Sequence, residues 1–483
     1  MRYFLDPFGC AKNQVDAETI MAVLNESGWT PCSSAGQSDL IIVNSCGFIE
    51  AAKRESINAV LAWKNRYPEK KVLLAGCLAQ RYREELLESL PEADGFLGSG
   101  ELPAAALAAS ALMTNRRFTG AALQSAVGQS AAGQSAALQG AAGAPDRTAP
   151  GDRPLLGFPG SAYVKISEGC NKRCSFCAIP LIRGPLRCRS VPEILEECRR
   201  LLGRGIRELC LVGQDLASYR PGLGKLLRAM AELPGRFWVR LLYLHPDSLR
   251  ARPFPLISDI LSLMEQDHRF LPYFDIPFQH ASPSILKAMN RRGGGAIYLN
   301  LLETIRRRLP DAVIRSTFLT GFPGETAADF KLLLDFQAQA RFDWLGVFAY
   351  SREEGTPAYS MEGRVRKKAA LDRKARIEER QVPITEDRMD RFVGRTMEVL
   401  LEEPVGSAAE APLPSGALLS PRGPGAAGGD SLWLGRLYCH APEVDGAAVV
   451  CSADTQKLRA LKPGSLVPGR ISRRAGFDME IWV

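Results

Sequence analysis

Three cysteines within eight residues constrain this chain more than any other feature. The stretch Glu168–Cys177 reads EGCNKRCSFC and places Cys170, Cys174 and Cys177 at Cys-x3-Cys-x2-Cys spacing. Such a loop can bind three corners of a four-iron cluster and leave one iron open. A closed zinc site needs a fourth Cys or His at ligand spacing, and the next histidine, His245, is far along the chain. The alternative is three unrelated buried thiols, because free Cys is often a small buried hydrophobe.

The bulk composition predicts a cytoplasmic protein of two to four domains. The chain has 483 residues, and its 12 cysteines are too sparse for a secreted disulfide scaffold, which favours metal ligation in a reducing compartment. Asp6 interrupts the apolar run that a signal peptide needs, and no 18-residue apolar run follows, so we expect neither export nor a membrane span. A net charge of +8 permits contact with RNA or the ribosome but does not require it.

Residues 1–114 alternate strand-like and helix-like patterns, which predicts a domain with a parallel α/β layer. The expected strands are Tyr3–Leu5, Leu40–Val43 and Val72–Leu74, and we expect two of the following helices at Asp16–Asn25 and Arg81–Leu90. One cysteine follows each strand. Because ligands collect at the carboxyl ends of parallel strands, these thiols can converge on one point. From spacing alone, a second cluster and ordinary buried cysteines remain equal alternatives for Cys10, Cys46 and Cys77.

Two low-complexity segments divide the rest of the chain. Residues 115–153 are rich in Ala, Gly, Ser and Gln and contain the direct repeat Gly128–Ala132 and Gly133–Ala137, which predicts a flexible linker. The alternative is an Ala-rich helix packed on the surface. A Gly/Ala/Pro/Ser-rich insert at about 404–430 predicts a disordered extension.

Residues 154–388 contain six strand patterns, most of them separated by helical patterns. This predicts a partial (β/α)6 barrel in which chemistry belongs at the carboxyl ends of the strands, where the cysteine loop also falls. A charged helix at about 365–391 closes this unit, with a solvated face as its ordinary explanation. In residues 389–483, the alternating segments Phe392–Leu401 and Met479–Val483 predict a small antiparallel, OB-like β-barrel.

A four-iron cluster with one open iron, at the mouth of a partial barrel, can hold a cofactor by its amine and carboxylate and supply one electron. This is the chemistry of radical S-adenosylmethionine (SAM) enzymes, in which a 5′-deoxyadenosyl radical takes hydrogen from an unactivated carbon. General base catalysis is not indicated, because the four histidines form no HExxH motif and no evident nucleophile pair.

Almost the whole chain resembles the radical SAM methylthiotransferase family. The amino-terminal resemblance lies in Gly9–Asp16, Val43–Ile49 and Gly76–Gln80, and it implies that Cys10, Cys46 and Cys77 bind an auxiliary 4Fe-4S cluster. In the barrel, Cys170, Cys174 and Cys177 match the ligands of the 4Fe-4S cluster that cleaves SAM. The resemblance also implies two SAM molecules per turnover and a carboxy-terminal TRAM domain that engages the substrate. The residues expected to bind SAM are Phe176, Gly213, Gln214, Asp215, Ser316, Gly321 and Glu325.

Within this family, the chain is more similar to the branch that modifies an aspartate of ribosomal protein uS12 than to the branch that modifies adenosine 37 of tRNA. The similarity lies in Val212–Leu216, Pro277–Pro283 and Ala441–Gly446. From Phe392 onward there are nine basic and ten acidic residues, a balance that suits a basic protein better than RNA.

The resemblance therefore implies a monomeric enzyme that adds a methylthio group to the aspartate β-carbon. Its expected partners are uS12 or the small ribosomal subunit, an electron donor such as flavodoxin or ferredoxin, and a sulfur donor. Two alternatives remain open: a tRNA methylthiotransferase, and a non-catalytic iron–sulfur or zinc protein that binds the ribosome. Candidates to hold the aspartate carboxylate, with ordinary salt bridges as their alternative role, are Arg189, Arg240 and Arg315.

Overall fold

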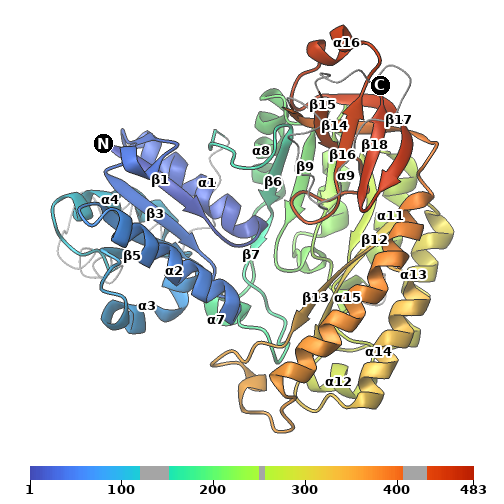
Figure 1. Cartoon of the computed structure of the whole chain (residues 1–483), viewed down its shortest axis with the longest axis horizontal. Helices are drawn as coiled ribbons and strands as arrows, with labels where there is room; N and C mark the ends of the chain where they lie inside the picture. Colours follow the sequence, from blue (N-terminus) through green and yellow to red (C-terminus); the bar gives the residue numbers. More distant parts are fainter. Residues whose placement is uncertain (120–151, 250–255, 406–431) are drawn as a thin grey trace.

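The computed structural model describes residues 1–119, 152–249, 256–405 and 432–483. Most of the predicted linker at 115–153 and of the predicted insert at about 404–430 lies outside the described residues. Three units are visible in Figure 1: an amino-terminal lobe, a central partial barrel, and a small closed barrel at the carboxyl end.

The amino-terminal lobe is a five-stranded parallel sheet with helices on both faces (Figure 1). The expected strands are present, and the sheet adds a short strand at each edge. Strand β3 is buried along its whole length, because helices cover both faces of a parallel sheet. The strands are β1 (Arg2–Pro7), β2 (Thr30–Pro31), β3 (Leu40–Ser45), β4 (Lys71–Gly76) and β5 (Gly95–Gly98), in the order β2-β1-β3-β4-β5. The helices are α1 (Ala11–Glu26), α2 (Glu50–Arg66), α3 (Cys77–Ser89) and α4 (Ala105–Met113).

Two helices of this lobe begin earlier than the sequence pattern predicts. Helix α1 starts at Ala11 rather than Asp16, and α3 starts at Cys77 rather than Arg81. The first turns of α1 carry buried polar side chains, including Asn13 and Asp16, which contact the central barrel instead of solvent. The apolar periodicity that identifies a helix is therefore hidden there. As a result, two of the cysteines sit directly at helix amino termini.

The central unit is a six-stranded parallel sheet, curved into a partial barrel, as predicted (Figure 1). Its strands are β6 (Ser161–Lys165), β9 (Glu208–Val212), β10 (Trp238–Leu241), β11 (Phe270–Asp275), β12 (Val313–Thr320) and β13 (Trp344–Ala349), in the order β13-β12-β11-β10-β9-β6. The sheet packs against α8 (Val191–Gly203), α9 (Leu223–Ala231), α11 (Leu256–Gln266), α13 (Gly295–Arg308) and α14 (Ala327–Ala340) in one large hydrophobic core. Because β6 and β13 are the two edges, the barrel stays open on one side.

The carboxy-terminal unit is a closed five-stranded barrel, reached through the charged helix α15 (Lys367–Asp390). The strands are β14 (Thr396–Val405), β15 (Leu432–Arg436), β16 (Ala448–Cys451), β17 (Leu466–Ala475) and β18 (Asp478–Trp482). Their order is β14-β15-β16-β18-β17, and the pairing is antiparallel except between β16 and β18. The expected small barrel is thus confirmed, with one parallel pair.

The closed barrel sits at the amino-terminal ends of the central strands. Arg436 contacts Ser161 and Glu208, the first residues of β6 and β9. Trp344, the first residue of β13, donates its indole N–H to the Cys439 carbonyl at 2.7 Å. The cysteine loop follows β6 and therefore lies at the opposite ends of the strands.

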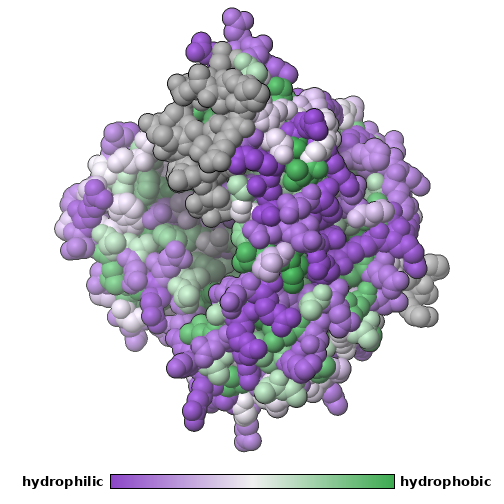
Figure 2. All heavy atoms as spheres, turned by 45° about the vertical axis from the view of Figure 1, so that its right-hand side comes forward, coloured by the Kyte–Doolittle hydropathy of each residue, from purple (hydrophilic) through white to green (hydrophobic). Residues whose placement is uncertain are grey.

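The face shown in Figure 2 carries hydrophobic residues only in small, separate patches. Across the described parts of the chain, no helix combines the length and the apolar character needed to cross a membrane.

Candidate active site

The cysteine loop is held on both sides by hydrogen bonds to backbone carbonyl groups. On one side, the Cys170 N–H donates to the Gly184 carbonyl at 3.1 Å. On the other side, the Ser175 N–H and hydroxyl donate to the carbonyls of Met289 and Ala288 at 3.1 and 2.7 Å. The loop leads directly into the short helix α7 (Ile179–Arg183). These anchors fix the three thiols at the open end of the barrel, as predicted for chemistry at strand carboxyl ends.

His245 lies beside this loop although it is distant in sequence. Its Nε2 is 3.9 Å from the Cys174 sulfur. Burial, together with the charges of Arg291 and Lys172, lowers the pKa of His245 to about 2, so the ring is neutral. Among the described residues, no third Cys, His, Asp or Glu joins this pair closely enough to bind a single metal ion. No motif or spacing in the sequence predicts this contact.

A tight polar cradle lies beside the loop, at the carboxyl ends of β6 and β9. A Cβ placed on Gly213 would lie 2.7 Å from the Ser167 hydroxyl oxygen, so any larger residue would displace the Ser167 side chain. The Ser167 Oγ and Gln214 Oε1 atoms are buried and have no hydrogen-bond partner among the residues that the structure describes. The Gln214 Nε2 atom donates to the Glu168 carboxylate at 2.9 Å, and this hydrogen bond orients the side-chain amide. Unpaired buried polar atoms are costly, so this cradle fits the polar end of a ligand such as SAM.

Other residues expected at the SAM site have partners within the protein. The Asp215 carboxylate accepts four hydrogen bonds, from Ala217, Ser218, His245 and Ser248. The Ser316 hydroxyl donates to the Ile276 carbonyl at 2.8 Å and accepts from the Phe278 N–H at 3.3 Å. Asp215 and Ser316 are 2 % and 0 % exposed, respectively. Their side chains shape the strand ends, and their role in cofactor binding stays a prediction.

Gly321 and Glu325, two further residues predicted to bind SAM, belong to the turn after β12. Glu325 accepts the backbone N–H groups of Gly321 and Phe322 and pairs with Arg373 at 3.0 Å. This arrangement holds the turn rigidly at the mouth of the barrel, while contact of Gly321 and Glu325 with SAM stays a prediction.

Phe176 packs in a small hydrophobic cluster with Phe322 and Tyr350. The Arg291 guanidinium lies 5.6 Å from the centre of the Phe176 ring. Phe176 thus ties the cysteine loop to the ends of β12 and β13.

The second set of cysteines converges at the edge of the amino-terminal sheet. Cys10 caps α1, Cys46 follows β3 and Cys77 begins α3. The Asn13 side-chain oxygen lies 3.4 Å from the Cys10 sulfur and 3.6 Å from the Cys77 sulfur. Burial, with the neighbouring Cys77 and Cys10 thiols adding to it, raises the pKa of Cys46 to about 11. Three segments far apart in the sequence thus bring their thiols into one neighbourhood.

Each triplet has the chemistry of an iron–sulfur ligand set. No three thiols among the described residues are packed as tightly as the ligands of one metal ion. In a four-iron cluster each thiolate binds a different iron, which requires a wider arrangement. The thiols of a triplet still lie close enough to affect one another. Burial raises the pKa of Cys177 to about 12, and the neighbouring Cys174 and Cys170 thiols add to this shift. Three thiols at each place match the number of protein ligands that a four-iron cluster with one open iron needs.

The glycines before two of these cysteines serve the local backbone. Gly9 and Gly76 have φ of +106° and +96°. A Cβ would lie 2.8 Å from the Asn13 side chain at Gly9 and 2.7 Å from the Ser45 carbonyl oxygen at Gly76. Both positions require glycine because of a left-handed conformation and close packing against the protein itself.

Buried charges join the amino-terminal lobe to the barrel beside both triplets. Lys165 pairs with Asp16 of α1 and with Glu168, at 2.8 Å each. Arg183, at the end of α7, pairs with the same two carboxylates at 2.6 and 3.2 Å. All four side chains are nearly inaccessible to solvent. The junction is therefore buried and held by direct ion pairs.

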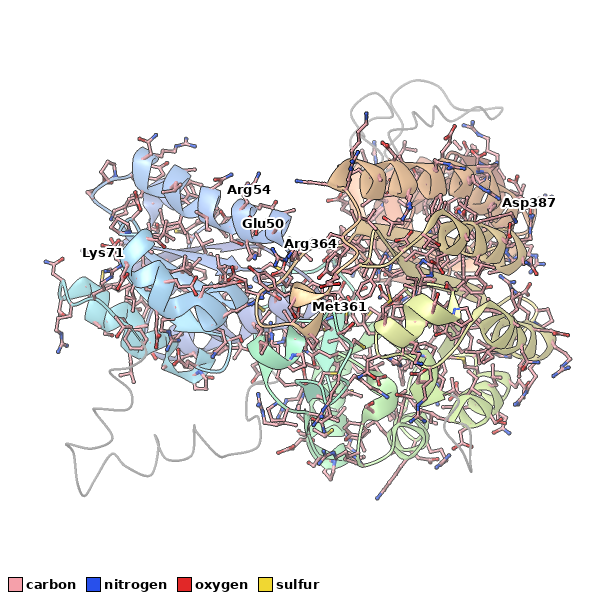
Figure 3. The ribbon with its side chains drawn as sticks, turned by 90° about the horizontal axis from the view of Figure 1, so that it is seen from below. Glu50, Arg54, Lys71, Met361, Arg364 and Asp387 are labelled. Carbon is pink, nitrogen blue, oxygen red and sulfur yellow. The ribbon has the colours of Figure 1, made fainter. Side chains whose placement is uncertain are left out.

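A cavity of about 1140 Å³ opens between the amino end of α2 and the carboxyl ends of β12 and β13. Tyr350 of its wall also packs in the cluster that contains Phe176, and Ile49 lies three residues after Cys46. In Figure 3, Glu50 and Arg54 of α2 face Arg364 of the barrel unit across the gap between the two lobes. The charged residues that line the cavity are Arg54, Arg352, Arg364, Lys367, Glu50 and Glu55.

Three arginines suggested for substrate binding are structural. Arg189 pairs with Glu197 at 2.5 Å, and Arg240 with Glu208 at 2.7 Å. Arg315 pairs with Asp445 of the closed barrel at 3.4 Å. Each guanidinium is already neutralised by a buried carboxylate, so the salt-bridge alternative is confirmed.

Comparison with known proteins agrees with this geometry. Residues 2–98 match the model of the uncharacterized protein family UPF0004, and residues 164–336 match that of the radical SAM superfamily. Among solved structures, the tryptophan-bound radical SAM methyltransferase TsrM of Kitasatospora setae superposes with a TM-score of 0.51 at 15 % identity. The match covers 74 % of each chain. This likeness confirms the predicted fold class of the central region.

Curated relatives match over almost the full length. The uS12 methylthiotransferase RimO of Treponema denticola is 41 % identical over 99 % of both chains. RimO of Pelotomaculum thermopropionicum is 37 % identical over 98 % of this chain and 96 % of its own. The resemblance derived from the cysteine motifs is thereby confirmed, and the chain belongs to the RimO family of radical SAM ribosomal protein uS12 methylthiotransferases.

Proposed function

We propose that this protein adds a methylthio group to the β-carbon of an aspartate in ribosomal protein uS12, using SAM and two 4Fe-4S clusters. One observation carries the proposal: Ala178, which directly precedes α7, and Ile182 of α7 pack on Cys77. Since Ala178 follows Cys177 in sequence, a single short helix separates the two triplets. An enzyme that generates a radical at one cluster and takes sulfur from another needs this proximity.

The two triplets have different tasks in this proposal. Cys170, Cys174 and Cys177 would hold the cluster that cleaves SAM, and Cys10, Cys46 and Cys77 would hold the auxiliary cluster. When bound, these groups supply the one-electron cleavage of SAM and the sulfur that is transferred.

The protein side chains bind, orient and enclose the reactants. The unpaired oxygens of Ser167 and Gln214 offer acceptors for an ammonium group, and Gly213 leaves the room for it. The buried pairs of Lys165 and Arg183 with Asp16 and Glu168 keep water out of the junction. A dry site protects a carbon radical from side reactions.

The substrate segment enters through the cavity between α2 and the ends of β12 and β13. Four of its six charged lining residues are cationic, a surplus that favours a carboxylate-bearing segment. The 1140 Å³ volume accommodates a loop of a protein. The closed barrel, at the far ends of the strands, contacts a different part of the partner. Turnover further requires an electron donor such as flavodoxin or ferredoxin, and a sulfur donor.

Iron analysis tests the two-cluster part of the proposal. Anaerobically reconstituted protein should contain about eight irons per chain, and replacing Cys10, Cys46 and Cys77 together by alanine should leave about four. The matched control replaces the buried Cys198, Cys210 and Cys439, which lie outside both triplets, by alanine and should retain all the iron. A wild-type content near four irons that the first substitution does not change would contradict the proposal.

Mass spectrometry tests the substrate. uS12 from cells that lack the gene should lose the mass of one methylthio group, whereas the tRNA nucleosides should be unchanged. Loss of a methylthio group from tRNA with uS12 unchanged would assign the protein to tRNA modification instead. A cluster-loaded protein that forms no 5′-deoxyadenosine with SAM and a strong reductant would favour a non-catalytic role.

A further inference from the structure

One guanidinium lies between the two cysteine triplets. The Arg183 Nη2 atom is 2.9 Å from the Cys77 sulfur and 3.2 Å from the Asn13 side-chain oxygen. Its Nη1 atom pairs with Asp16 and Glu168. The side chain is 4 % exposed, so these contacts are not shared with bulk water.

The contacts of Arg183 reach segments of both triplets, namely those that carry Cys10, Cys77, Cys170 and Cys177. Asn13 and Asp16 belong to α1, which begins directly after Cys10. Glu168 precedes Cys170 by two residues, and Arg183 itself ends the helix that follows Cys177. A shift of either triplet relative to the other would therefore break at least one contact to this side chain.

We propose that Arg183 is a positioning residue that donates a charge-assisted hydrogen bond to the Cys77 sulfur and thereby tunes the auxiliary cluster and holds it in register with the SAM cluster. This proposal rests on the assignment of Cys10, Cys46 and Cys77 as cluster ligands. It extends the proposed function by naming the residue that couples the two sites.

The chemistry of iron–sulfur ligation supports this role. Hydrogen bonds and positive charge at a ligand sulfur stabilise the reduced, more negative cluster and raise its reduction potential. Arginine donates in a fixed planar geometry, which lets one side chain bind a sulfur and two carboxylates at once. Lysine has a single nitrogen and cannot reproduce all of these contacts.

The experiment isolates the auxiliary cluster by replacing Cys170, Cys174 and Cys177 with alanine. In this background, Arg183→Met removes the donors but keeps an apolar stem, and Arg183→Lys keeps the charge. Redox titration followed by electron paramagnetic resonance should give a lower midpoint potential for Arg183→Met, with an intermediate value for Arg183→Lys. In the complementary background, with Cys10, Cys46 and Cys77 replaced by alanine, Arg183→Met should leave the midpoint potential of the SAM cluster unchanged.

Arg153 provides a matched control. It is a buried arginine that also joins the two units, by pairing with Glu18 of α1 and Glu197 of α8, and among the described residues it makes no hydrogen bond to a cysteine of either triplet. Arg153→Met should weaken the junction but leave the midpoint potential and the resonance of the auxiliary cluster unchanged. In the full enzyme, Arg183→Met should slow formation of methylthiolated product about tenfold or more, while retaining SAM cleavage.

The outcomes separate the two proposals. An unchanged potential in Arg183→Met on a loaded auxiliary cluster, or the same shift in Arg153→Met, would overturn the role of Arg183 alone. Failure of wild-type Cys10, Cys46 and Cys77 to load iron would instead overturn the cluster assignment on which it rests. If Arg183→Met does not retain soluble protein, Arg183→Lys decides: a potential equal to that of wild type contradicts the geometric part of the proposal.

Discussion

Glu208 should make a large and pH-dependent contribution to the attachment of the closed barrel. Its carboxylate is fully buried and accepts hydrogen bonds from Arg240 at 2.7 Å, Arg436 at 2.6 Å and Ser161 at 2.8 Å. Burial opposes ionisation, but Arg436 and Arg240 outweigh it and lower the pKa from 4.5 to about 2. At 1.36 kcal/mol per pKa unit, this shift corresponds to about 3 kcal/mol of stability.

The substitution Glu208→Gln keeps the shape of the side chain and removes the charge. It leaves two arginines facing a neutral group, a defect that costs about 3–5 kcal/mol when a buried ion pair loses one partner. The two routes to the magnitude agree. We expect the free energy of unfolding, measured with urea on the iron-free protein at pH 7, to fall by about 3 kcal/mol.

The pH dependence gives a sharper test. Because the pKa of Glu208 is lower in the folded than in the unfolded protein, its ionised form stabilises the fold fully above about pH 4.5. This stabilisation is lost as the pH falls toward 2. The difference between wild type and Glu208→Gln should therefore be the same at pH 7 and pH 5.5, and should narrow below about pH 4.5. The control Glu265→Gln breaks an exposed pair with Arg308 and should have a much smaller effect. A Glu208→Gln protein within about 0.5 kcal/mol of wild type at pH 7 would refute the reasoning.

Two further predictions concern the cofactor cradle and the domain junction. Gly213→Ala would bring a methyl group within 2.7 Å of the Ser167 hydroxyl and should weaken SAM binding about tenfold by calorimetry, whereas Gly203→Ala, with open space around it, should bind normally. Glu353→Gln removes the buried partner of Arg81 (2.7 Å) and should make the α2–α3 region more sensitive to limited proteolysis. Equal cleavage rates in Glu353→Gln and the wild-type protein would show that this ion pair does not hold the α2–α3 region.

The sequence predicted the architecture because its signals are local. An apolar run such as Leu40–Val43 identifies a buried parallel strand, and alternation with helical patterns implies the layers around it. The convergence of Cys10, Cys46 and Cys77 also followed, since each lies just after a strand of one parallel sheet.

Long-range polar contacts could not be predicted from one chain. Arg183 and Cys77 are 106 positions apart, and His245 and Cys174 are 71 apart. No periodicity or spacing rule links such residues. Arg240 is another example, because its substrate-binding and salt-bridge roles give the same sequence signal, and only the position of Glu208 distinguishes them. The buried polar side chains at the start of α1 likewise hide the apolar periodicity of its first turn. Their partners on the central barrel are distant in sequence, so a short sequence window cannot reveal them.

The placement of the closed barrel sets a minimum length for any partner that contacts both this barrel and the cysteine loop. It contacts the first residues of β6, β9 and β13, whereas the cysteine loop is at the other ends of the strands. Strand β12 has eight residues, and at about 3.3 Å per residue it spans roughly 25 Å. A partner that touches the closed barrel and also presents an atom to the cysteine loop must reach across this distance. The length of the strands therefore sets this minimum distance. A folded ribosomal protein is long enough to span it, and a free amino acid is not.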